Sequence, residues 1–191
     1  AFGTAVVVCD NSSDGTGDMA EAAGAEVVRH TRNRGYEGAI ESGFARALEI
    51  GAGMVVTIDA DGQLPADRIP DFIGPIDRGE ADLVMGQRPA AARFSEALFN
   101  VYTRLRFGVT DVLCGMKGYR IGLYQRHGAF DRLMSTGTEL ALASIKGGAQ
   151  VSFVPVTVAP RADAPRFGSV WKANRRILGS LFRIMVWDLR G

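Results

Sequence analysis

The sequence predicts an α/β fold in which helices flank a Rossmann-like, mostly parallel sheet and an amphipathic helix lies at the C-terminal end. Two observations predict it. Short apolar runs without polar alternation, typical of strands covered on both faces, alternate with segments of helical periodicity. The chain has 191 residues, 47% of them hydrophobic, which suffices for one domain with a sizeable core.

The first half of the chain shows this alternation clearly. An apolar run over residues 4–9 ends in capping and turn residues, and a short helix over 19–23 precedes the next strand, 26–29. Residues 36–50 have the strongest helical periodicity and are followed by glycines. One face of that helix is apolar, with Ala39, Ile40, Phe44, Ala47 and Leu48. The elements expected next are a strand over 54–58, a helix over 65–76 and a strand over 81–85.

The second half is less regular and more basic. We expect helices over 94–107 and 139–145, strands over 116–119 and 151–156, and a loop rich in Pro, Arg and Ala over 160–167. The net charge is −9 through residue 85 and +10 from residue 86 onward, although the whole chain carries only +1. This asymmetry indicates an anionic partner for the second half: a phosphate, a membrane surface or a nucleic acid.

The last segment, 169–189, is predicted to be an amphipathic helix. At about 100° per residue, its basic side chains fall within an arc of roughly 40°. They are Lys172, Arg176, Arg183 and Arg190, and the neighbouring apolar face holds Trp171, Leu178, Leu181, Phe182, Met185 and Leu189. A basic helix that carries aromatic residues is typical of a membrane interface. The alternative is that the helix packs on the core or on a second copy of the chain, in a homo-oligomer.

The cysteines indicate a reducing compartment. Cys9 lies in an apolar strand and Cys114 far along the chain, without metal-site spacing, so we expect reduced structural thiols in the cytosol. The sequence contains no apolar stretch of about 18 residues and does not open on a signal-peptide pattern. Together with the last helix, this predicts a cytoplasmic protein bound peripherally to the cytoplasmic face of the membrane.

Two carboxylates and a carboxamide follow the strand at 54–58. Asp59, Asp61 and Gln63 alternate with small residues, so in an extended segment their side chains would point the same way. Three oxygen donors at the exposed end of a strand suit a hard divalent cation and leave positions for phosphate oxygens. A polar turn in which Gly62 supplies a special backbone angle explains the same residues without a metal. The spacing alone leaves both interpretations open.

Other polar residues are expected at the same edge of the sheet. Asp10 ends the first strand and Arg88 follows the strand at 81–85, which places both at the carboxyl edge where open α/β sheets bind ligands. Asn33 and Gly35 precede the helix at 36–50, whose N-terminus favours a negative group.

Taken together, six segments resemble family 2 glycosyltransferases of the GT-A fold, most closely the dolichyl-phosphate and polyprenyl-phosphate sugar transferases. The resemblance covers residues 6–169. The matching segments, in the family's order, are 7–16 (VVCDNSSDGT), 33–39 (NRGYEGA), 59–63 (DADGQ), 86–88 (GQR), 111–117 (DVLCGMK), and 154–156 (VPV) with Arg161 and Ser169 beyond it.

The resemblance implies an inverting, metal-assisted transfer of a sugar from a nucleotide sugar, of the GDP-mannose or UDP-glucose type, to a polyprenyl or dolichyl phosphate. Asp59 and Asp61 match the family's Asp-x-Asp (DXD) pair and Gln63 a third donor, which together would hold Mg²⁺ or Mn²⁺ on the diphosphate. Asp10 matches a carboxylate that contacts the nucleotide base and ribose. The substrate-binding residues implied in this way are Asp10, Asn11, Ser12, Asn33, Gly35, Asp59, Arg88, Arg161, Arg166 and Ser169.

For the acceptor, the resemblance points to Arg88 and Asp111, which join Asp61 as the expected catalytic residues. A lipid phosphate is already anionic near neutral pH and needs no strong general base, so arginines that orient it matter more. Arg161 and Arg166 are candidates to clamp that phosphate, and Asp111 is the best candidate for a base or a positioning carboxylate. A surface ion pair for Arg88, and a turn cap for Asp111, are the structural alternatives.

The resemblance also implies a division of the chain into a catalytic domain, residues 1–168, and a C-terminal helix, 169–191. Family members open with a strand and a Pro-x-x-Asn-Glu motif, and this chain is expected to start after that strand. The segment between Arg88 and Asp111 is shorter than the family's acceptor region. The implied partners are a nucleotide sugar, a lipid phosphate and a membrane surface, and no nucleic acid.

Three other functions fit part of the pattern. A haloacid dehalogenase-type phosphotransferase would use Asp59 and Asp61, but it needs a hydroxyl shortly after them, where this chain has Gly62 and Gln63. A polysaccharide or protein hydroxyl acceptor would require a true base, for which Asp111 is the candidate. A non-catalytic protein that binds nucleotide sugars is the third.

Overall fold

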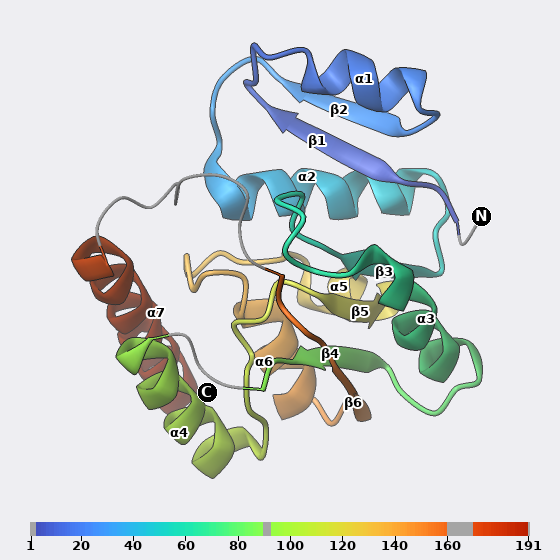
Figure 1. Cartoon of the computed structure of the whole chain (residues 1–191). Coiled ribbons are helices and arrows are strands. Elements are labelled where there is room, and N and C mark those ends of the chain that lie inside the picture. Colours follow the sequence, from blue (N-terminus) through green and yellow to red (C-terminus); the bar gives the residue numbers. More distant parts are fainter. Residues whose placement is uncertain (1–2, 90–92, 160–169, 191) are drawn as a thin grey trace.

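The computed structural model describes residues 3–89, 93–159 and 170–190 and arranges them as two sheets with one helix between them (Figure 1). The first sheet pairs β1 with β2, and the second has the strand order β3-β5-β4-β6. The strands are β1 (Val6–Asp10), β2 (Glu26–His30), β3 (Met54–Thr57), β4 (Leu83–Gln87), β5 (Lys117–Arg120) and β6 (Val151–Pro155).

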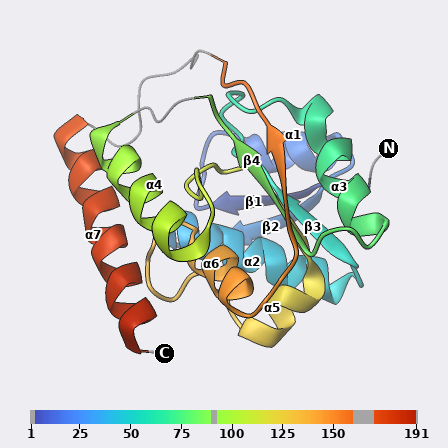
Figure 2. The same ribbon diagram turned by 90° about the horizontal axis from the view of Figure 1, so that it is seen from below.

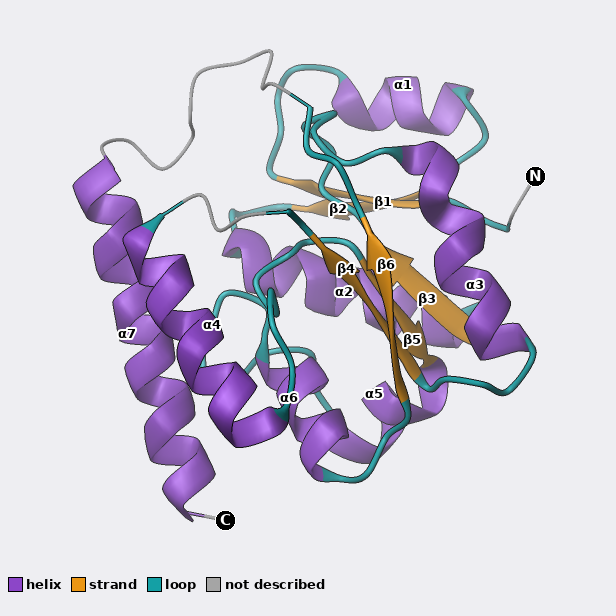
Figure 3. Ribbon diagram, turned by 60° about the horizontal axis from the view of Figure 1, so that its bottom comes forward, coloured by secondary structure: helices purple, strands orange, loops and turns teal. Residues whose placement is uncertain are grey.

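Helices surround both sheets and cover them (Figure 3). They are α1 (Thr16–Ala22), α2 (Gly35–Glu49), α3 (Ile69–Asp77) after the 3₁₀ turn Ala66–Arg68, α4 (Phe94–Phe107), α5 (Ile121–His127), α6 (Glu139–Lys146) and α7 (Val170–Arg190). The predicted α/β class is confirmed. All predicted strands and helices within the described residues are present, with ends that shift by a few residues.

The second sheet is mixed. β1 and β2 are parallel, as are β4 and β6, but β5 runs antiparallel between β3 and β4. Lys117, the first residue of β5, pairs with Thr57 and Met85 near the carboxyl ends of both neighbours. The chain therefore enters β5 from the carboxyl edge of the sheet and must run in the opposite direction.

Helix α2 carries the aromatic centre of the core. Phe44 is buried and stacks on Tyr124 and Phe130, with ring centroids 5.0 and 5.4 Å apart, while Tyr119 meets it edge-on at 5.4 Å. These partners come from β5, α5 and the loop before α6, so one side chain of α2 ties three later segments together. Such ring pairs stabilise beyond their buried area.

The sequence did not predict helix α5. It has only seven residues, too few for a helical period to stand out, and it follows β5 directly. It ends at Gly128, whose φ of 77° is a left-handed helix cap.

Helices α4 and α7 lie side by side at one flank of the molecule (Figure 2). Ile177, Leu181 and Ile184 of α7 are buried in the main core. The apolar face predicted for this helix therefore splits, because Leu181 points inward while the other members stay exposed: Trp171, Leu178, Phe182, Met185 and Leu189. No helix among the described residues is long and apolar enough to span a membrane.

Phe44→Ala should destabilise the fold by about 3–5 kcal/mol, because it leaves a cavity among three aromatic rings. Phe94→Ala, the same change at a side chain that is 78% exposed, should shift stability by less than about 0.5 kcal/mol. Urea unfolding monitored by circular dichroism measures both. Equal effects would show that α2 is not the centre of the core.

Candidate functional site

The loops that leave β3, β4 and β6 meet at one edge of the second sheet. In the loop after β3, the carbonyl of Gln63 accepts a hydrogen bond from the N–H of Ala159 at 2.9 Å, and its side-chain amide donates to the Ala159 carbonyl at 3.2 Å. Beside them, the N–H of Val156 donates to the carbonyl of Gln87 at 2.8 Å. The segment beyond β6 therefore lies against the loop that carries the two aspartates.

Asp10, at the end of β1, binds the N-terminus of α2. Its carboxylate accepts hydrogen bonds from the backbone N–H groups of Arg34 at 2.7 Å and Gly35 at 2.8 Å. His30 Nδ1 lies 2.7 Å from the same carboxylate, and Ser42 holds the other ring nitrogen. Although partial burial opposes it, these hydrogen bonds lower the pKa of Asp10 below its ordinary value.

The other predicted donor-side residues gather around this point. The side-chain oxygen of Asn33 accepts from the N–H of Gly35 at 3.0 Å, so Asn33 and Asp10 share one donor. Asn11 has a left-handed backbone, with φ of 61°, which turns the chain sharply after β1, and Ser12 is exposed in the turn that follows. The structure thus brings Asp10, Asn33 and Gly35 together, and Asn11 and Ser12 follow Asp10 in the turn after β1.

Asp59 lies against the backbone of Gly115. A Cβ at Gly115 would be 2.2 Å from Asp59 Oδ2, so only glycine leaves room for the carboxylate there. Thr57 fixes the same segment, because its hydroxyl donates to the Gly115 carbonyl at 2.8 Å. The segment before β5 therefore forms a cradle for the first aspartate of the pair.

Asp61 and Gln63 lie in a polar turn, the second of the two interpretations that the sequence left open, and not in an extended segment with three aligned side chains. β3 ends at Thr57, and Gly62 takes a left-handed φ of 72°. The carboxylate of Asp61 accepts from the N–H of Gln63 at 3.1 Å, the hydrogen bond of an Asx turn. The local hydrogen bond overrides the extended geometry that alternating residues would allow.

The oxygen donors of this turn suit a hard divalent cation in part. Two carboxylates and an amide oxygen are ligand types that Mg²⁺ and Mn²⁺ accept, and the cradle at Gly115 positions one of them. Among the described residues no group of three His, Cys, Asp or Glu side chains forms a complete metal site. The described part of this turn therefore offers three oxygen donors, Asp59, Asp61 and Gln63, of the types that such a cation accepts.

A half-buried tyrosine and a buried lysine of the site were not singled out by the sequence. Burial raises the pKa of Tyr36 well above its ordinary value, with further contributions from the charges of Asp59, Glu37 and Asp131. Lys117 is buried, and its ammonium donates to the carbonyl of Cys114 at 2.6 Å. Desolvation lowers the pKa of this lysine, and the carboxylate of Asp59 opposes the shift. A lysine inside an apolar strand was the signal that could have identified it.

Arg88 and Asp111 form one ion pair. The backbone N–H of Arg88 donates to Asp111 Oδ2 at 2.7 Å, and its guanidinium binds both oxygens of that carboxylate. A second carboxylate, Glu96, lies 3.2 Å from the same guanidinium. Burial alone would lower the pKa of Arg88, but the hydrogen bonds and charge of Asp111, with the charge of Glu96, raise it overall. The pair is largely buried, so it is not the surface ion pair considered as an alternative.

Asp111 also shapes the chain around it. Its φ is 55°, a strained value for a residue with a side chain, and its N–H donates to the side chain of Asn100 at 2.9 Å. Its backbone carbonyl accepts from the N–H of Cys114, whereas its carboxylate binds Arg88. The turn is therefore closed by the backbone and not by the side chain. Arg161, Arg166 and Ser169, the remaining predicted residues, lie outside the described residues.

Comparison with known proteins identifies relatives of this arrangement. A family model described as glycosyl transferase family 2 matches residues 4–127. The undecaprenyl-phosphate mannosyltransferase of Micrococcus luteus is 29% identical over 177 residues, which covers 82% of this chain and 72% of that protein. The polyprenol monophosphomannose synthase of Mycolicibacterium smegmatis is 26% identical over 208 residues, with 97% and 76% covered.

Solved structures show a similar fold. Glucosyl-3-phosphoglycerate synthase from Mycobacterium tuberculosis, in complex with phosphoglyceric acid, matches with a TM-score of 0.69 at 23% identity, over 94% of this chain and 68% of that one. The same synthase with Mn²⁺, UDP-glucose and phosphoglyceric acid matches with a TM-score of 0.68 at 22% identity, over 93% and 66%. At this level of identity the likeness shows the fold, which is the predicted GT-A type.

Asp10→Asn should destabilise the protein by about 1–2 kcal/mol at neutral pH, because an amide cannot accept two N–H bonds as a charged carboxylate does. The pKa of Asp10 is lowered in the fold, so its contribution is fully present above the ordinary value of 3.8 and is lost as the pH falls through the folded pKa. The difference from wild type should shrink below about pH 4. Urea unfolding between pH 3 and 7 measures it.

The control is Asp67→Asn, at an exposed residue of the 3₁₀ turn. It should show little change in stability at any pH. A stability difference for Asp10→Asn that does not depend on pH would contradict the charged hydrogen-bond role.

Proposed function

The chain belongs to glycosyl transferase family 2, and we propose that it transfers a sugar from a nucleotide sugar to a polyprenyl or dolichyl phosphate, with inversion. The observation that carries the proposal is that the start of α2 lies near both carboxylates: Asp10 accepts from the N–H of Gly35, and the next residue, Tyr36, is within range of the charge of Asp59. Relatives named for transfer to undecaprenyl phosphate and polyprenol support the acceptor class.

On the donor side, Asp10, Asn11, Ser12, Asn33 and Gly35 would bind the nucleotide. Asp10 and Asn33 already orient the first turn of α2, so a nucleotide would meet a preformed edge. Asp59, Asp61 and Gln63 would hold Mg²⁺ or Mn²⁺ against the diphosphate. Bound there, the cation would stabilise the charge that develops on the leaving nucleoside diphosphate.

On the acceptor side, a lipid phosphate is anionic near neutral pH and can attack the sugar without a strong general base. The chain's task is then to orient it. Arg88 would contact the acceptor through a guanidinium whose position Asp111 fixes, which makes Asp111 a positioning carboxylate. Arg161 and Arg166, in the C-terminal part of the proposed catalytic domain 1–168, and Ser169, the first residue of the segment 169–191, remain proposed phosphate contacts.

We also propose that the protein works at the cytoplasmic face of a membrane. Helix α7 exposes a stripe of apolar residues (Trp171, Leu178, Phe182, Met185 and Leu189), and the neighbouring α4 exposes Phe94, Leu98, Val101 and Leu105, which recur at intervals of four, three and four residues. Arg104 and Lys172, both exposed, are next in sequence to Leu105 and Trp171. An apolar surface edged with cations suits anionic lipid headgroups.

Asp61→Ala should abolish divalent-dependent transfer, with a loss of at least about a hundredfold, because the cation would lose a carboxylate that counters its charge. The measurement is transfer of labelled mannose or glucose from GDP-mannose or UDP-glucose to a short polyprenyl phosphate, with Mg²⁺ or Mn²⁺. Asp67→Ala, at an exposed aspartate of the 3₁₀ turn that follows, is the control. Full activity of Asp61→Ala, in a protein that unfolds like wild type, would refute the metal role.

Asp111→Asn distinguishes the acceptor classes. With a phosphate acceptor, Asp111→Asn should lower turnover only because it holds Arg88 less firmly. The pH dependence of turnover should then stay that of wild type. If the acceptor is a hydroxyl, loss of the base should abolish turnover. The rates with a polyprenyl phosphate and with glycan acceptors, measured across pH, separate the two.

Phe182→Glu with Leu189→Glu should release the protein from anionic vesicles, because both side chains lie on the exposed stripe and not in the core. Met19→Glu, at an exposed apolar residue of α1, is the control. Deleting α7 would not be a clean test, because its inner face belongs to the core. Unchanged sedimentation with vesicles, or a change from dimer to monomer in solution, would contradict the membrane assignment.

A further inference from the structure

Asp10 belongs to a ring of hydrogen bonds whose side chains beyond Asp10 itself have no role in the proposed function. His30 Nδ1 lies 2.7 Å from Asp10 Oδ1, and His30 Nε2 lies 2.9 Å from the hydroxyl oxygen of Ser42. The guanidinium of Arg34 donates to the same hydroxyl oxygen at 3.0 Å, while its backbone N–H donates to Asp10 at 2.7 Å. The ring of contacts therefore starts and ends at Asp10.

Strand register and helical period bring these residues together. Asp10 and His30 are the last residues of β1 and β2 and are partners in the parallel register, so their side chains leave the same face of the sheet. Helix α2 packs against both strands (Figure 1), and Ser42 lies on it. A Cβ at Gly38 would be 2.8 Å from the Cβ of Arg34, so glycine there leaves the Arg34 side chain its path along the helix to Ser42.

The network assigns the hydrogen on the ring of His30. Although burial opposes it, hydrogen bonds lower the pKa of Asp10, so its carboxylate is ionised at neutral pH and can only accept. The contact with His30 Nδ1 therefore requires a hydrogen on that nitrogen. The Ser42 hydroxyl lies 2.9 Å from Nε2 and 3.1 Å from the carbonyl of Gly38, so it can donate to either. In both arrangements His30 donates to Asp10.

The carboxylate of Asp10 keeps one acceptor position for a ligand. A carboxylate offers about four such positions, two on each oxygen. Within the described part of the chain, His30 and Arg34 take both positions on Oδ1, and the N–H of Gly35 takes one on Oδ2. The side chain of Asp10 is 17% exposed and that of His30 only 7%, so a ligand can reach the carboxylate but not the ring.

The order of Ser42, His30 and Asp10 is also that of the nucleophile, base and carboxylate in hydrolase triads. Two observations argue against a hydrolytic role. The guanidinium of Arg34 donates to the oxygen of Ser42 that would have to attack a substrate, and the ring of His30 is buried. The cluster therefore holds Asp10 in place and does not supply a nucleophile.

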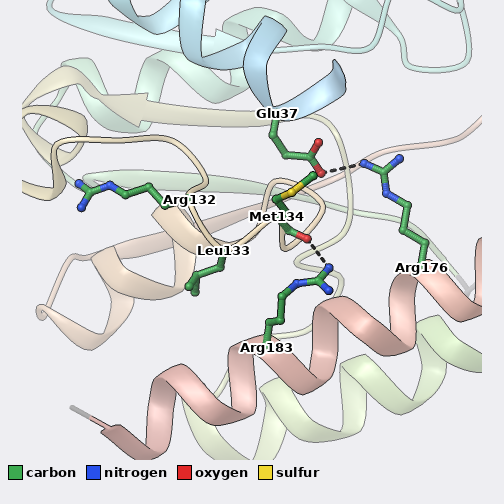
Figure 4. Close-up of a pocket in the computed structure, with 6 residues that line it drawn as sticks. All are labelled: Glu37, Arg132, Leu133, Met134, Arg176 and Arg183. Atoms are coloured by element: carbon green, nitrogen blue, oxygen red, sulfur yellow. Dashed lines mark hydrogen bonds and ion pairs between the residues drawn. The ribbon is translucent and has the colours of Figure 1, made fainter. Parts of the chain in front are cut away.

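The start of α2 is also fixed from the side of α7. Glu37, in the first turn of α2, has a buried carboxylate that pairs with Arg176 at 2.8 Å, and Figure 4 shows this guanidinium directed from α7 toward it. The two backbone N–H groups that bind Asp10 belong to the start of the same helix. His30 adds a third donor from the neighbouring strand. Three donors from two elements hold the carboxylate more rigidly than the helix alone would.

We propose that His30 is a positioning residue of the donor site, a proposal that rests on the function proposed above. It would hold Asp10 so that the remaining acceptor position on Oδ2 meets one N–H or O–H group of the nucleotide. His30 itself would not touch the nucleotide sugar. Because a carboxylate that is already oriented loses less freedom on binding, removal of this contact should weaken donor binding and leave acceptor binding unchanged.

The test uses two amides that each reproduce one ring nitrogen of histidine. The amide nitrogen of Asn takes the place of Nδ1, and that of Gln takes the place of Nε2. His30→Gln therefore loses the donor to Asp10, and its affinity for the nucleotide sugar should fall about tenfold or more. His30→Asn keeps that donor and should bind within about threefold of wild type. Calorimetry on the full chain with Mn²⁺, using GDP-mannose and UDP-glucose, measures both.

The chain's other histidine supplies the matched control. His127 Nε2 lies 2.8 Å from the carboxylate of Glu139, and neither residue is among those proposed to bind the donor. Because Nε2 is the bonded nitrogen there, His127→Asn is the change that loses the contact, and it should leave the affinity for nucleotide sugar unchanged. Ser42→Ala removes the partner of the His30 ring at a helix position that favours alanine, so its affinity should fall between those of wild type and His30→Gln.

Turnover assays separate positioning from a general loss of structure. His30→Gln should raise the KM for the nucleotide sugar and leave the KM for farnesyl phosphate unchanged. Equal donor affinities of His30→Gln and wild type, or equal losses in His30→Gln and His30→Asn, would overturn the proposal. If His30→Gln does not fold, Ser42→Ala carries the test, and wild-type affinity in that variant overturns it. If wild type binds neither nucleotide sugar, it is the proposed function itself that fails.

Discussion

The placement of helix α2 between the two sheets is the constraint on which the site depends. β1 and β2 form a sheet of their own, and α2 contacts both β1 and β3, so this helix connects Asp10 with the aspartates that follow β3. Asp10 holds its N-terminus through the N–H of Gly35, while Phe44 packs in the aromatic centre of the core. Glu41, between them, accepts from the hydroxyl of Tyr124 at 2.6 Å. The register of one helix therefore sets the distance between the two halves of the site.

The fold shows how much of the positive charge in the second half of the sequence is neutralised by ion pairs. Much of the basic second half is internally paired: Arg88 with Asp111 and Arg106 with Asp188, whose carboxylate also accepts from Lys146. Because these pairs neutralise their own charge, net charge alone overstates the surface available to an anion. Arg132 and Arg183, by contrast, donate to backbone carbonyls, which leave their charge in place.

Whether the sequence predicted a feature depends on how far apart in the chain the interacting residues lie. Helices α2, α4 and α7 were predictable because their periodicity is a property of consecutive residues. The direction of β5 was not, since it depends on where the chain re-enters the sheet. Likewise, the turn at Asp61 arises from a two-residue hydrogen bond that competes with the extended pattern. The roles of Tyr36 and Lys117 needed the fold, because burial and the nearby Asp59 create them.

The prediction that α7 is an amphipathic helix was right, but it did not separate the two apolar faces of the helix. Its residues face three directions, each about 120° from the next: Ile177 and Ile184 inward, Phe182 and Leu189 outward, and Arg176 and Arg183 toward α2 and the loop before α6. Dividing the helix into one basic and one apolar face merges the inward and the outward apolar residues. Leu181 was therefore grouped with residues that turn out to be exposed. The geometry has a consequence for the acceptor. If the outward stripe lies in a membrane interface, the arginine face points sideways, at the level of the headgroups. A lipid phosphate would then meet this basic face without its chain leaving the membrane.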